Sequence, residues 1–280
     1  MHDPLDERQF QIAVRRLAGS LSYGTDPSPF NGSGIEYVQS RPYVAGDPVK
    51  SIDWKVTARS GRVHVKEYAA TKRMPVWLLL DTSASMCLGS QSMTKYAWAV
   101  QVATALALAS LARVSPVGLL GCGTRDLDVR PSLSRARVFL WSHRLRGFRL
   151  DEQTTLARRL RQLGPRLDQR SLLVVLSDLH DPGALEALAP MAEEHDCVVI
   201  EFRDPAERGQ LGAGIFRARE AETGRRFTAH GATRWLDPEP AAAWLRRAGI
   251  DHLVLEIEKP VAPRLRAFWS RRATLGKGSR

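Results

Sequence analysis

An aspartate and two serines follow the most apolar run of the chain. Residues 76–80 read Val-Trp-Leu-Leu-Leu, and Asp81, Ser83 and Ser85 come after them at alternate positions. A short run of large apolar residues is typical of a strand that is buried on both faces in a parallel sheet. Ligands bind at the carboxyl ends of such strands, and carboxylate and hydroxyl oxygens suit Mg²⁺ or Mn²⁺ better than Zn²⁺. The spacing therefore predicts a site for a hard divalent cation.

The alternative is an ordinary turn from a strand into a helix. Ser and Thr often cap the helix that follows such a turn, so the sequence Asp-Thr-Ser alone would indicate little. We favour the metal interpretation because the D-x-S-x-S spacing is complete and because further oxygen donors occur downstream.

A second apolar strand also ends in an acid. Residues 172–176 read Leu-Leu-Val-Val-Leu and are followed by Ser177 and Asp178, so Asp178 is expected at the same edge of the sheet, with Asp181 as its rival. We expect His180, between the two acids, to be a surface loop residue, because a zinc site would need further His or Cys nearby.

The elements that must position these residues alternate between strands and helices. This alternation predicts an α/β fold with a mostly parallel sheet covered by helices on both faces. Strands are expected at 76–80, 117–122, 127–130, 172–178, 197–202 and 252–257, and a hairpin at 215–229 that turns at Thr223-Gly224. Helical spacing is found at 7–18, 92–114, 131–145, 151–163, 182–195 and 241–247, and from 260 onward.

Composition bounds the class of protein. The 280 residues are 44% apolar, which supports a substantial core, and the formal net charge of +11 favours acidic partners, nucleic acid or an anionic surface. The arginines are spread over several helices without a recognised nucleic-acid motif, so we favour a solvated or partner-facing surface.

Cysteine usage and apolar runs indicate the compartment. The three cysteines, Cys87, Cys122 and Cys197, lack C-x-x-C spacing, which favours reduced, buried thiols in a cytoplasmic protein. The first residues are acidic and polar, unlike a secretory signal, and the apolar stretch 97–112 is too interrupted to span a bilayer.

The segment 34–68 lies before Asp81 and its two serines, and its sequence pattern predicts a small β module. Ser60-Gly61 is a dipeptide typical of hairpin turns, and Val63 and Val65 alternate with polar residues. We expect Trp54 to be buried, within a cluster of charged residues of both signs, and the segment to pack on the α/β domain as one folding unit. The alternative for those charges is an ordinary solvated surface.

This segment also carries a family resemblance. The pattern R-P-Y-x-x-G-D-P-V-K-S-I-D-W-K-x-T-A-R-S-G, which continues into D-T-S-A-S, resembles the bacterial family called domain of unknown function fifty-eight. The resemblance extends over most of residues 30–272. It implies a von Willebrand factor A-like (Rossmann-like) domain at 74–258, after an N-terminal helix, loop and small β module at 1–73 and before a basic C-terminal helix and tail at 259–280. Many relatives carry membrane helices ahead of this segment, and none is expected here.

The resemblance completes the expected ligand set. Thr154 matches the threonine that von Willebrand factor A-like domains use in their second ligand loop, with Thr155 as the neighbour most easily confused with it, and Asp178 resembles the acid of the third loop. From the residues alone, a Thr at this position is by default a helix N-cap. One Mg²⁺ or Mn²⁺ would then be held by Asp81, Ser83, Ser85, Thr154 and Asp178.

The function expected from these features is a metal-dependent protein-interaction module rather than an enzyme. The resemblance implies a partner, since relatives are commonly encoded beside MoxR-type AAA+ ATPases and are thought to act with them as adaptors or chaperone-like factors. A Mg²⁺-dependent phosphoesterase of the haloacid-dehalogenase type is the first alternative, but it needs a second Asp where Ser83 stands. A basic nucleic-acid-binding protein is the second, and no Walker A, G-x-S-x-G or H-E-x-x-H motif supports another hydrolase.

Overall fold

A six-stranded sheet forms the centre of the molecule. The computed structural model describes residues 4–22, 36–69, 74–87, 89–125, 127–147, 151–208, 215–219, 226–230 and 239–274. The strand order is β10-β7-β6-β3-β4-β5, in which β5 is antiparallel to β4 and the other neighbours are parallel. The strands are β3 (Val76–Leu80), β4 (Val117–Gly121), β5 (Asp128–Ser132), β6 (Leu172–Ser177), β7 (Asp196–Arg203) and β10 (Asp251–Glu256).

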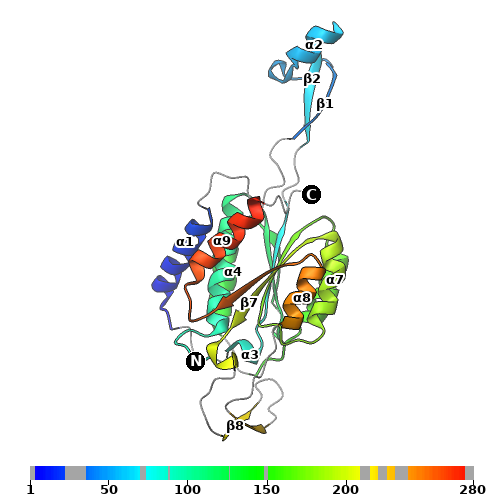
Figure 1. The fold of residues 1–280 in the computed structure, drawn as a ribbon. Helices are drawn as coiled ribbons and strands as arrows, with labels where there is room; N and C mark the ends of the chain where they lie inside the picture. The colour runs from blue at the N-terminus through cyan, green and yellow to red at the C-terminus, as the bar shows by residue number, and fades with distance from the viewer. Residues whose placement is uncertain are drawn as a thin grey trace.

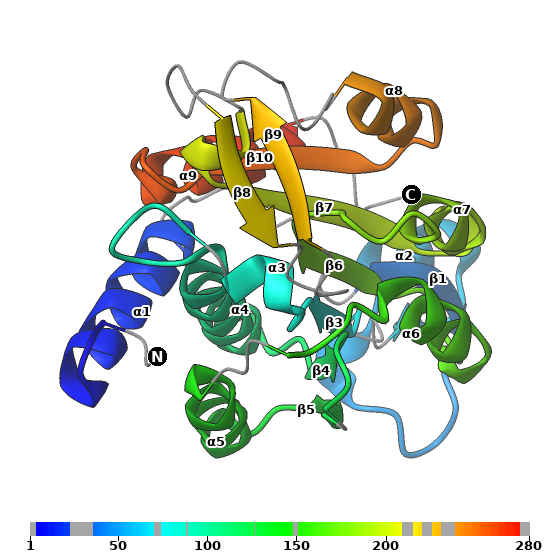
Figure 2. The ribbon, with the colours of Figure 1, turned by 90° about the horizontal axis from the view of Figure 1, so that it is seen from below.

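Both faces of the central strands β3, β4 and β6 are buried, as the apolar runs predicted. Side chains of β3 alternate between two cores, with Val76, Leu78 and Leu80 in one and Trp77 and Leu79 in the other. Figure 2 shows the sheet between two layers of helices. The first layer is α1 (Glu7–Ser22), α4 (Lys95–Ala112), α5 (Arg135–Arg146) and α9 (Val261–Thr274), and the second is α6 (Leu156–Leu163), α7 (Ala184–Glu194) and α8 (Glu239–Arg247).

The topology confirms the expected fold. Numbered by their order along the chain, the six strands run 3-2-1-4-5-6 across the sheet, which is the doubly wound order of nucleotide-binding folds. The third strand is an antiparallel edge and the other neighbours are parallel, so the sheet is mostly parallel, as expected for the von Willebrand factor A-like fold that the family resemblance implies. The carboxyl ends of β3 and β6 therefore lie side by side, and the short helix α3 (Ala84–Cys87) follows β3 at this edge.

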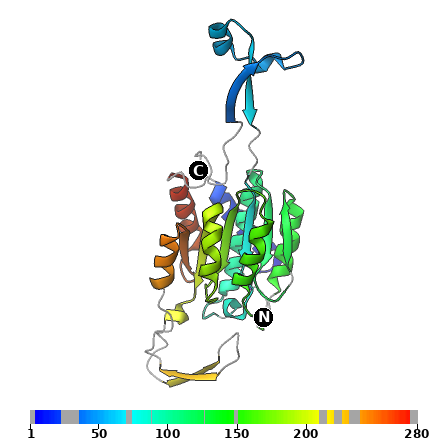
Figure 3. The same ribbon diagram turned by 90° about the vertical axis from the view of Figure 1, so that its right-hand side faces the viewer.

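The segment before β3 folds as a separate hairpin with a helical tip. Strands β1 (Glu36–Pro42) and β2 (His64–Ala69) are antiparallel, and η1 (Val49–Ser51) and α2 (Trp54–Ser60) lie in the connection between them. Figures 1 and 3 show this hairpin beyond the end of the sheet at which β3 begins.

Three expectations for this hairpin were wrong. Its described part extends away from the α/β domain instead of packing on it, as Figures 1 and 3 show. Trp54 is 67% exposed, because it is the first residue of α2 at the tip and no core is close enough to cover it. The dipeptide Ser60-Gly61 does not turn one strand into the next. Gly61 instead ends α2 with a φ of 68°, in the left-handed region that favours glycine at the ends of helices.

A second hairpin follows β7. After η3 (Pro205–Arg208), strands β8 (Ile215–Arg219) and β9 (Arg226–His230) pair antiparallel, which confirms the hairpin expected at 215–229. Its expected turn at Thr223-Gly224 lies outside the described residues.

All three cysteines are buried and free, as the absence of paired spacing indicated. Among the residues that the structure describes, no helix is both long and apolar enough to cross a membrane. The C-terminal helix α9 is tied to the sheet by Arg272, whose buried guanidinium contacts Asp196 of β7 and lies 2.6 Å from Asp251 of β10.

Candidate functional site

Asp81 lies at the centre of the site, directly after β3. Its backbone N–H donates to the carbonyl of Leu176 on β6 at 2.9 Å, which fixes it at the carboxyl edge of the sheet. The residue is only 1% exposed. Oδ1 accepts from the backbone N–H of Ser83 at 3.0 Å, and Oδ2 accepts from the hydroxyls of Ser177 at 2.7 Å and Thr154 at 3.3 Å.

The serines of the D-x-S-x-S loop lie in the same place. Ser83 Oγ and Ser85 Oγ are 3.0 Å apart, and both residues are buried. Alternate spacing brings them together because the chain turns from β3 into the single turn of α3 within these five residues. The structure therefore gathers four of the predicted site residues, which are Asp81, Ser83, Ser85 and Thr154.

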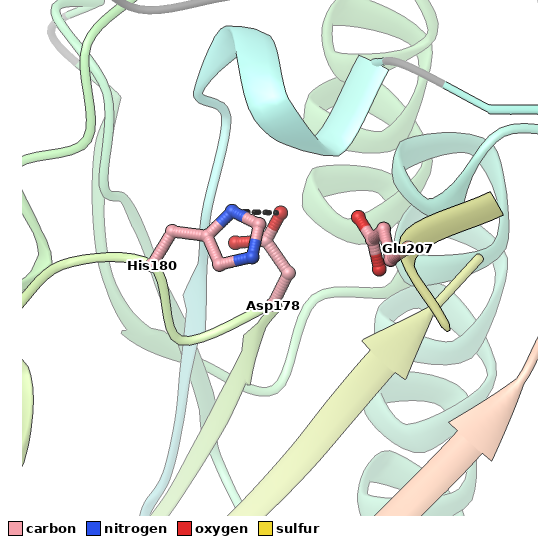
Figure 4. Close-up of side chains that lie close together, drawn as sticks. All are labelled: Asp178, His180 and Glu207. Atoms are coloured by element: carbon pink, nitrogen blue, oxygen red, sulfur yellow. Dashed lines mark ion pairs between the residues drawn. The ribbon is translucent and has the colours of Figure 1, made fainter. Parts of the chain in front are cut away.

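Asp178 follows β6 at the same edge, but it faces a cation that the protein itself supplies. Lys95 Nζ lies 2.7 Å from Asp178 Oδ2 and also contacts the carboxylate of Glu207 in η3. Lys95 is fully buried. His180 joins the group with Nδ1 3.4 Å from the same Asp178 oxygen, and Figure 4 shows the three side chains of Asp178, His180 and Glu207 turned toward a common space.

Sequence reasoning missed Lys95, although the sequence carries a signal for it. Lys95 begins α4 and is its only charged residue. A positive charge in the first turn opposes the helix dipole, so its presence there suggests a carboxylate partner elsewhere in the fold. His180, expected to be a surface loop residue, is instead partly buried beside Asp178.

The two aspartates differ in charge environment. Burial raises the pKa of Asp81 to about 7, and the nearby charge of Asp178 adds to the increase. Burial also opposes ionisation of Asp178, but the charge and hydrogen bond of the Lys95 ammonium, together with smaller contributions from His180 and Ser85, lower the pKa of this carboxyl. Asp178 is therefore the firmly ionised acid, whereas Asp81 lies beside hydroxyls, and no cationic side chain of the described residues forms an ion pair with it.

Asp181 and Thr155, the alternatives to Asp178 and Thr154, form hydrogen bonds elsewhere. Asp181 accepts from the backbone N–H of Ala157 at 2.8 Å and from that of Gly183 at 3.0 Å, so it holds the first turn of α6 and its own loop. The Thr155 hydroxyl donates to the carbonyl of Gly123 at 3.0 Å. Of the alternatives that the sequence left open, Thr154 and Asp178 are therefore the ones that face the site.

Glu152 is a second residue that sequence reasoning missed. It is 1% exposed, its Oε2 accepts from the Thr82 hydroxyl at 2.8 Å, and its carboxylate forms an ion pair with Arg125. Its backbone carbonyl accepts from Ala84 N–H at 2.7 Å. A Cβ on Gly123 would overlap both Thr82 and Glu152, so only glycine fits beside this brace. Glu152 thus holds the loop of residues 81–85 in place through its contacts with Thr82 and Ala84.

The donor set fits a hard divalent cation. All the side chains gathered around Asp81 offer oxygen, which is the donor that Mg²⁺ and Mn²⁺ prefer. In addition, Asp178 Oδ1 is buried and has no hydrogen-bond partner among the described residues, and such an atom is costly unless a cation or water faces it. The residues that would hold the ion are Asp81, Ser83, Ser85, Thr154 and Asp178.

A second group of possible ligands does not fit a metal. Asp178, His180 and Glu207 offer ligand atoms within 4.8 Å of one another. The ammonium of Lys95, however, contacts both carboxylates of this group. A divalent cation placed among them would meet a fixed positive charge at contact distance, so this group is the binding place of Lys95 rather than of a metal.

Comparisons with known proteins found similar sequences and similar solved structures. Three uncharacterized proteins, from Mycobacterium bovis and two strains of Mycobacterium tuberculosis, are each 27% identical over 254 residues, covering 87% of this chain and 78% of theirs. The crystal structure of the SpRpn10 VWA domain is 14% identical with a TM-score of 0.37, covering 69% of this chain and 93% of that chain. An uncharacterized membrane spanning protein from Vibrio fischeri is 17% identical with a TM-score of 0.24, covering 71% of this chain and 96% of that chain.

The sequence also matches a known protein family over most of its length. Residues 39–237 match the family described as protein of unknown function DUF58, which is the family that the 41–61 pattern resembles. The match includes the hairpin tip, the D-T-S-A-S loop and the segments that carry Thr154 and Asp178. The chain therefore belongs to the DUF58 family.

Proposed function

We propose that this protein is a metal-dependent protein-interaction module and that its partner is a MoxR-type AAA+ ATPase, for which it serves as an adaptor or chaperone-like factor. The DUF58 family and the von Willebrand factor A-like fold support the coarser statement, a protein-interaction module. Metal dependence rests on the site described above, and the choice of an ATPase rests on the family resemblance.

The observation that carries the proposal is the convergence of oxygen donors around Asp81. Two carboxylates and three hydroxyls form an incomplete shell for Mg²⁺, which prefers six oxygen ligands. When bound, the ion would offer an open position to a carboxylate oxygen of a partner. Asp81 would give up its proton on binding, because metal ligands must be deprotonated.

Charged residues around the site would shape both affinity and approach. Lys95 already compensates one negative charge at Asp178, so the site attracts a cation less strongly than two free carboxylates would. We expect weak metal binding for this reason. Arg158 and Arg161 are exposed on α6, next to the Thr154 loop, and would attract an acidic surface, with faster association at low salt.

The test is a pull-down with the MoxR-type ATPase encoded nearest to this protein, carried out with Mg²⁺ and with EDTA. We expect binding in Mg²⁺, loss of binding in EDTA, and loss in Asp81→Asn, which keeps the size of the side chain but removes its charge. Calorimetry with Mg²⁺ and Mn²⁺ on the same variant measures the metal site directly.

The matched control is Asp168→Asn, since Asp168 is an exposed aspartate away from the site. It should bind metal and partner like the wild type. Unchanged metal affinity in Asp81→Asn would overturn the site. Metal binding without any partner binding would leave the site in place and overturn the choice of ATPase.

The enzymatic alternative is tested separately. A haloacid-dehalogenase-type phosphoesterase needs a second carboxylate near the first, and the side chain two positions after Asp81 is the hydroxyl of Ser83. We infer an interaction role rather than catalysis. Release of phosphate from a generic aryl phosphate, dependent on Mg²⁺ and lost in Asp81→Asn, would contradict this inference.

A further inference from the structure

The tip of the β1–β2 hairpin exposes an unusual group of apolar side chains. Val49 is 69% exposed, Trp54 67% and Val44 61%. Of the nine large apolar side chains that are exposed in the described residues, five lie between residues 43 and 63, and the other four are scattered over the rest of the molecule. Grouped exposed apolar residues mark an interaction surface, whereas scattered ones are normal.

The exposed charged side chains of the same tip that lack an ion-pair partner among the described residues are all basic. Its exposed basic residues form no ion pair with any described residue, and they are Lys50, Lys55, Arg59 and Arg62. The two acids of the tip are already used. Asp47 pairs with Arg41 at 2.7 Å, and buried Asp53 caps α2 by accepting from the backbone N–H groups of Lys55 and Val56. The surface that the tip offers is therefore apolar and cationic.

Helix α2 carries both properties on its outer side. Trp54 and Ala58, four residues apart, are exposed together, and so are Lys55 and Arg59 on the neighbouring face. Thr57 faces inward, where its hydroxyl accepts from the backbone N–H of His64 at 3.0 Å. The helix is thus fixed to β2 by one side and presents an aromatic ring beside two long basic side chains on the other.

We propose that this hairpin tip, residues 43–63, docks on an anionic lipid bilayer. Charge complementarity is the first argument, because a bilayer with anionic headgroups attracts every one of the four basic residues without requiring a particular register. The side-chain types are the second argument. Trp partitions to the membrane interface, and Lys and Arg can extend along apolar surface toward the headgroups. Docking of a second copy is disfavoured because the chain carries a net charge of +11.

The topology gives the proposal a consequence. Strand β2 ends at Ala69 and β3 begins at Val76, so the hairpin joins the sheet at the amino end of β3. The site around Asp81 lies at the carboxyl end of the same strand. A bilayer bound at the tip would leave the Asp81 edge free for a protein partner, as the arrangement in Figure 1 indicates. The two bindings are independent, and the lipid proposal does not rest on the metal site.

The experiment uses the full chain and sedimentation with vesicles of phosphatidylcholine, with and without phosphatidylglycerol. One variant, Lys55→Gln with Arg59→Gln, removes two charges, and a second, Trp54→Ala with Val49→Ser, removes apolar surface. The control for charge is Arg135→Gln with Arg137→Gln, and the control for apolar surface is Leu140→Ser. These three control residues are exposed on α5.

We expect the wild type to sediment with the anionic vesicles, less so as salt rises. The tip charge variant should bind about thirtyfold more weakly, since each basic residue near an anionic surface contributes about 1 kcal/mol and 1.4 kcal/mol corresponds to tenfold. The apolar tip variant should lose about tenfold. Both control variants should bind like the wild type, and all variants should melt at the wild-type temperature because the replaced side chains are exposed.

Three outcomes would overturn the proposal. A chain that remains in the supernatant with both kinds of vesicle would leave a protein as the occupant of the tip. Equal losses in the tip and α5 charge variants would mean that net charge alone drives binding. Sedimentation equilibrium that shows a dimer in the wild type and a monomer in Trp54→Ala, without vesicle binding, would identify a second copy as the occupant.

Discussion

Replacement of Lys95 by Met tests the charge arrangement of the site most directly. Lys95 is fully buried, and its ammonium compensates Asp178 at 2.7 Å and contacts Glu207. Methionine fills a similar volume with an unbranched apolar chain, so the substitution removes the charge with little change in packing. The variant would leave Asp178 buried with an uncompensated charge, a short distance from Asp81.

The magnitude follows from two opposing effects. Two unit charges 2.7 Å apart attract each other by about 6 kcal/mol at an effective dielectric constant near 20. The variant also no longer has to desolvate an ammonium, which offsets part of that loss. Loss of one partner from a buried ion pair typically costs about 3–5 kcal/mol. For a chain of this size, that loss corresponds to a decrease of roughly 6–20 °C in melting temperature.

The assay is thermal and urea unfolding of wild type, Lys95→Met and the double variant Lys95→Met with Asp178→Asn, each in EDTA and in saturating Mg²⁺. If the cost comes from an orphaned carboxylate, the double variant should be more stable than Lys95→Met by about 1 kcal/mol or more. Mg²⁺ should stabilise Lys95→Met more than the wild type, because a site with one more uncompensated negative charge binds a cation more tightly.

Two results would refute this reasoning. A melting temperature of Lys95→Met within about 2 °C of the wild type in EDTA would mean that the ammonium does not compensate a buried charge. Equal stabilisation of both proteins by Mg²⁺ would mean that the metal, if it binds, does not interact with the charge of Asp178.

Three further predictions concern residues that support the site and the sheet. Gly123→Ala should destabilise the protein by about 1–3 kcal/mol, because the added Cβ would overlap the hydrogen-bonded side chains of Thr82 and Glu152. Urea unfolding measures this loss, and an unchanged midpoint would show that these side chains can shift. Arg272→Met should cost about 3–5 kcal/mol, since two carboxylates lose their shared cation; the check is again the unfolding midpoint, and a loss below about 1 kcal/mol would contradict the assigned role of the guanidinium. Glu201→Gln should destabilise near pH 7 and have little effect in acid. Burial opposes ionisation of Glu201, but hydrogen bonds from His252 and Arg203 lower its pKa below 4.5, so its stabilisation is present above that value and is lost as the pH falls through the folded-state pKa. An equal loss at both pH values would exclude this charge effect.

The hairpin shows where sequence patterns mislead. Alternation of Val63 and Val65 predicted a small β module, and β2 does contain Val65, which is buried; Val63, however, precedes the strand and is 44% exposed. The expectation of a buried Trp54 went together with the expectation that this segment packs on the α/β domain, because so short a segment buries too little surface to make a core alone. In this hairpin the nearest large core is that of the sheet, and the tip lies beyond it, so exposure was decided by the position of the whole segment.

The sequence by itself determined the sheet and the first half of the site. Apolar runs that end in an acid placed Asp81 and Asp178 at the carboxyl edge, and the D-x-S-x-S spacing placed two hydroxyls beside Asp81, because these relations depend only on strand direction and on a few consecutive residues. The choice between Thr154 and Thr155 or between Asp178 and Asp181 needed the tertiary structure, because neighbouring side chains leave a turn in different directions. Only the tertiary structure joined Lys95 to Asp178, which are 83 positions apart. That pairing depends on how α4 packs across β3 and β6, and a contact of this kind has no local period from which it could be read.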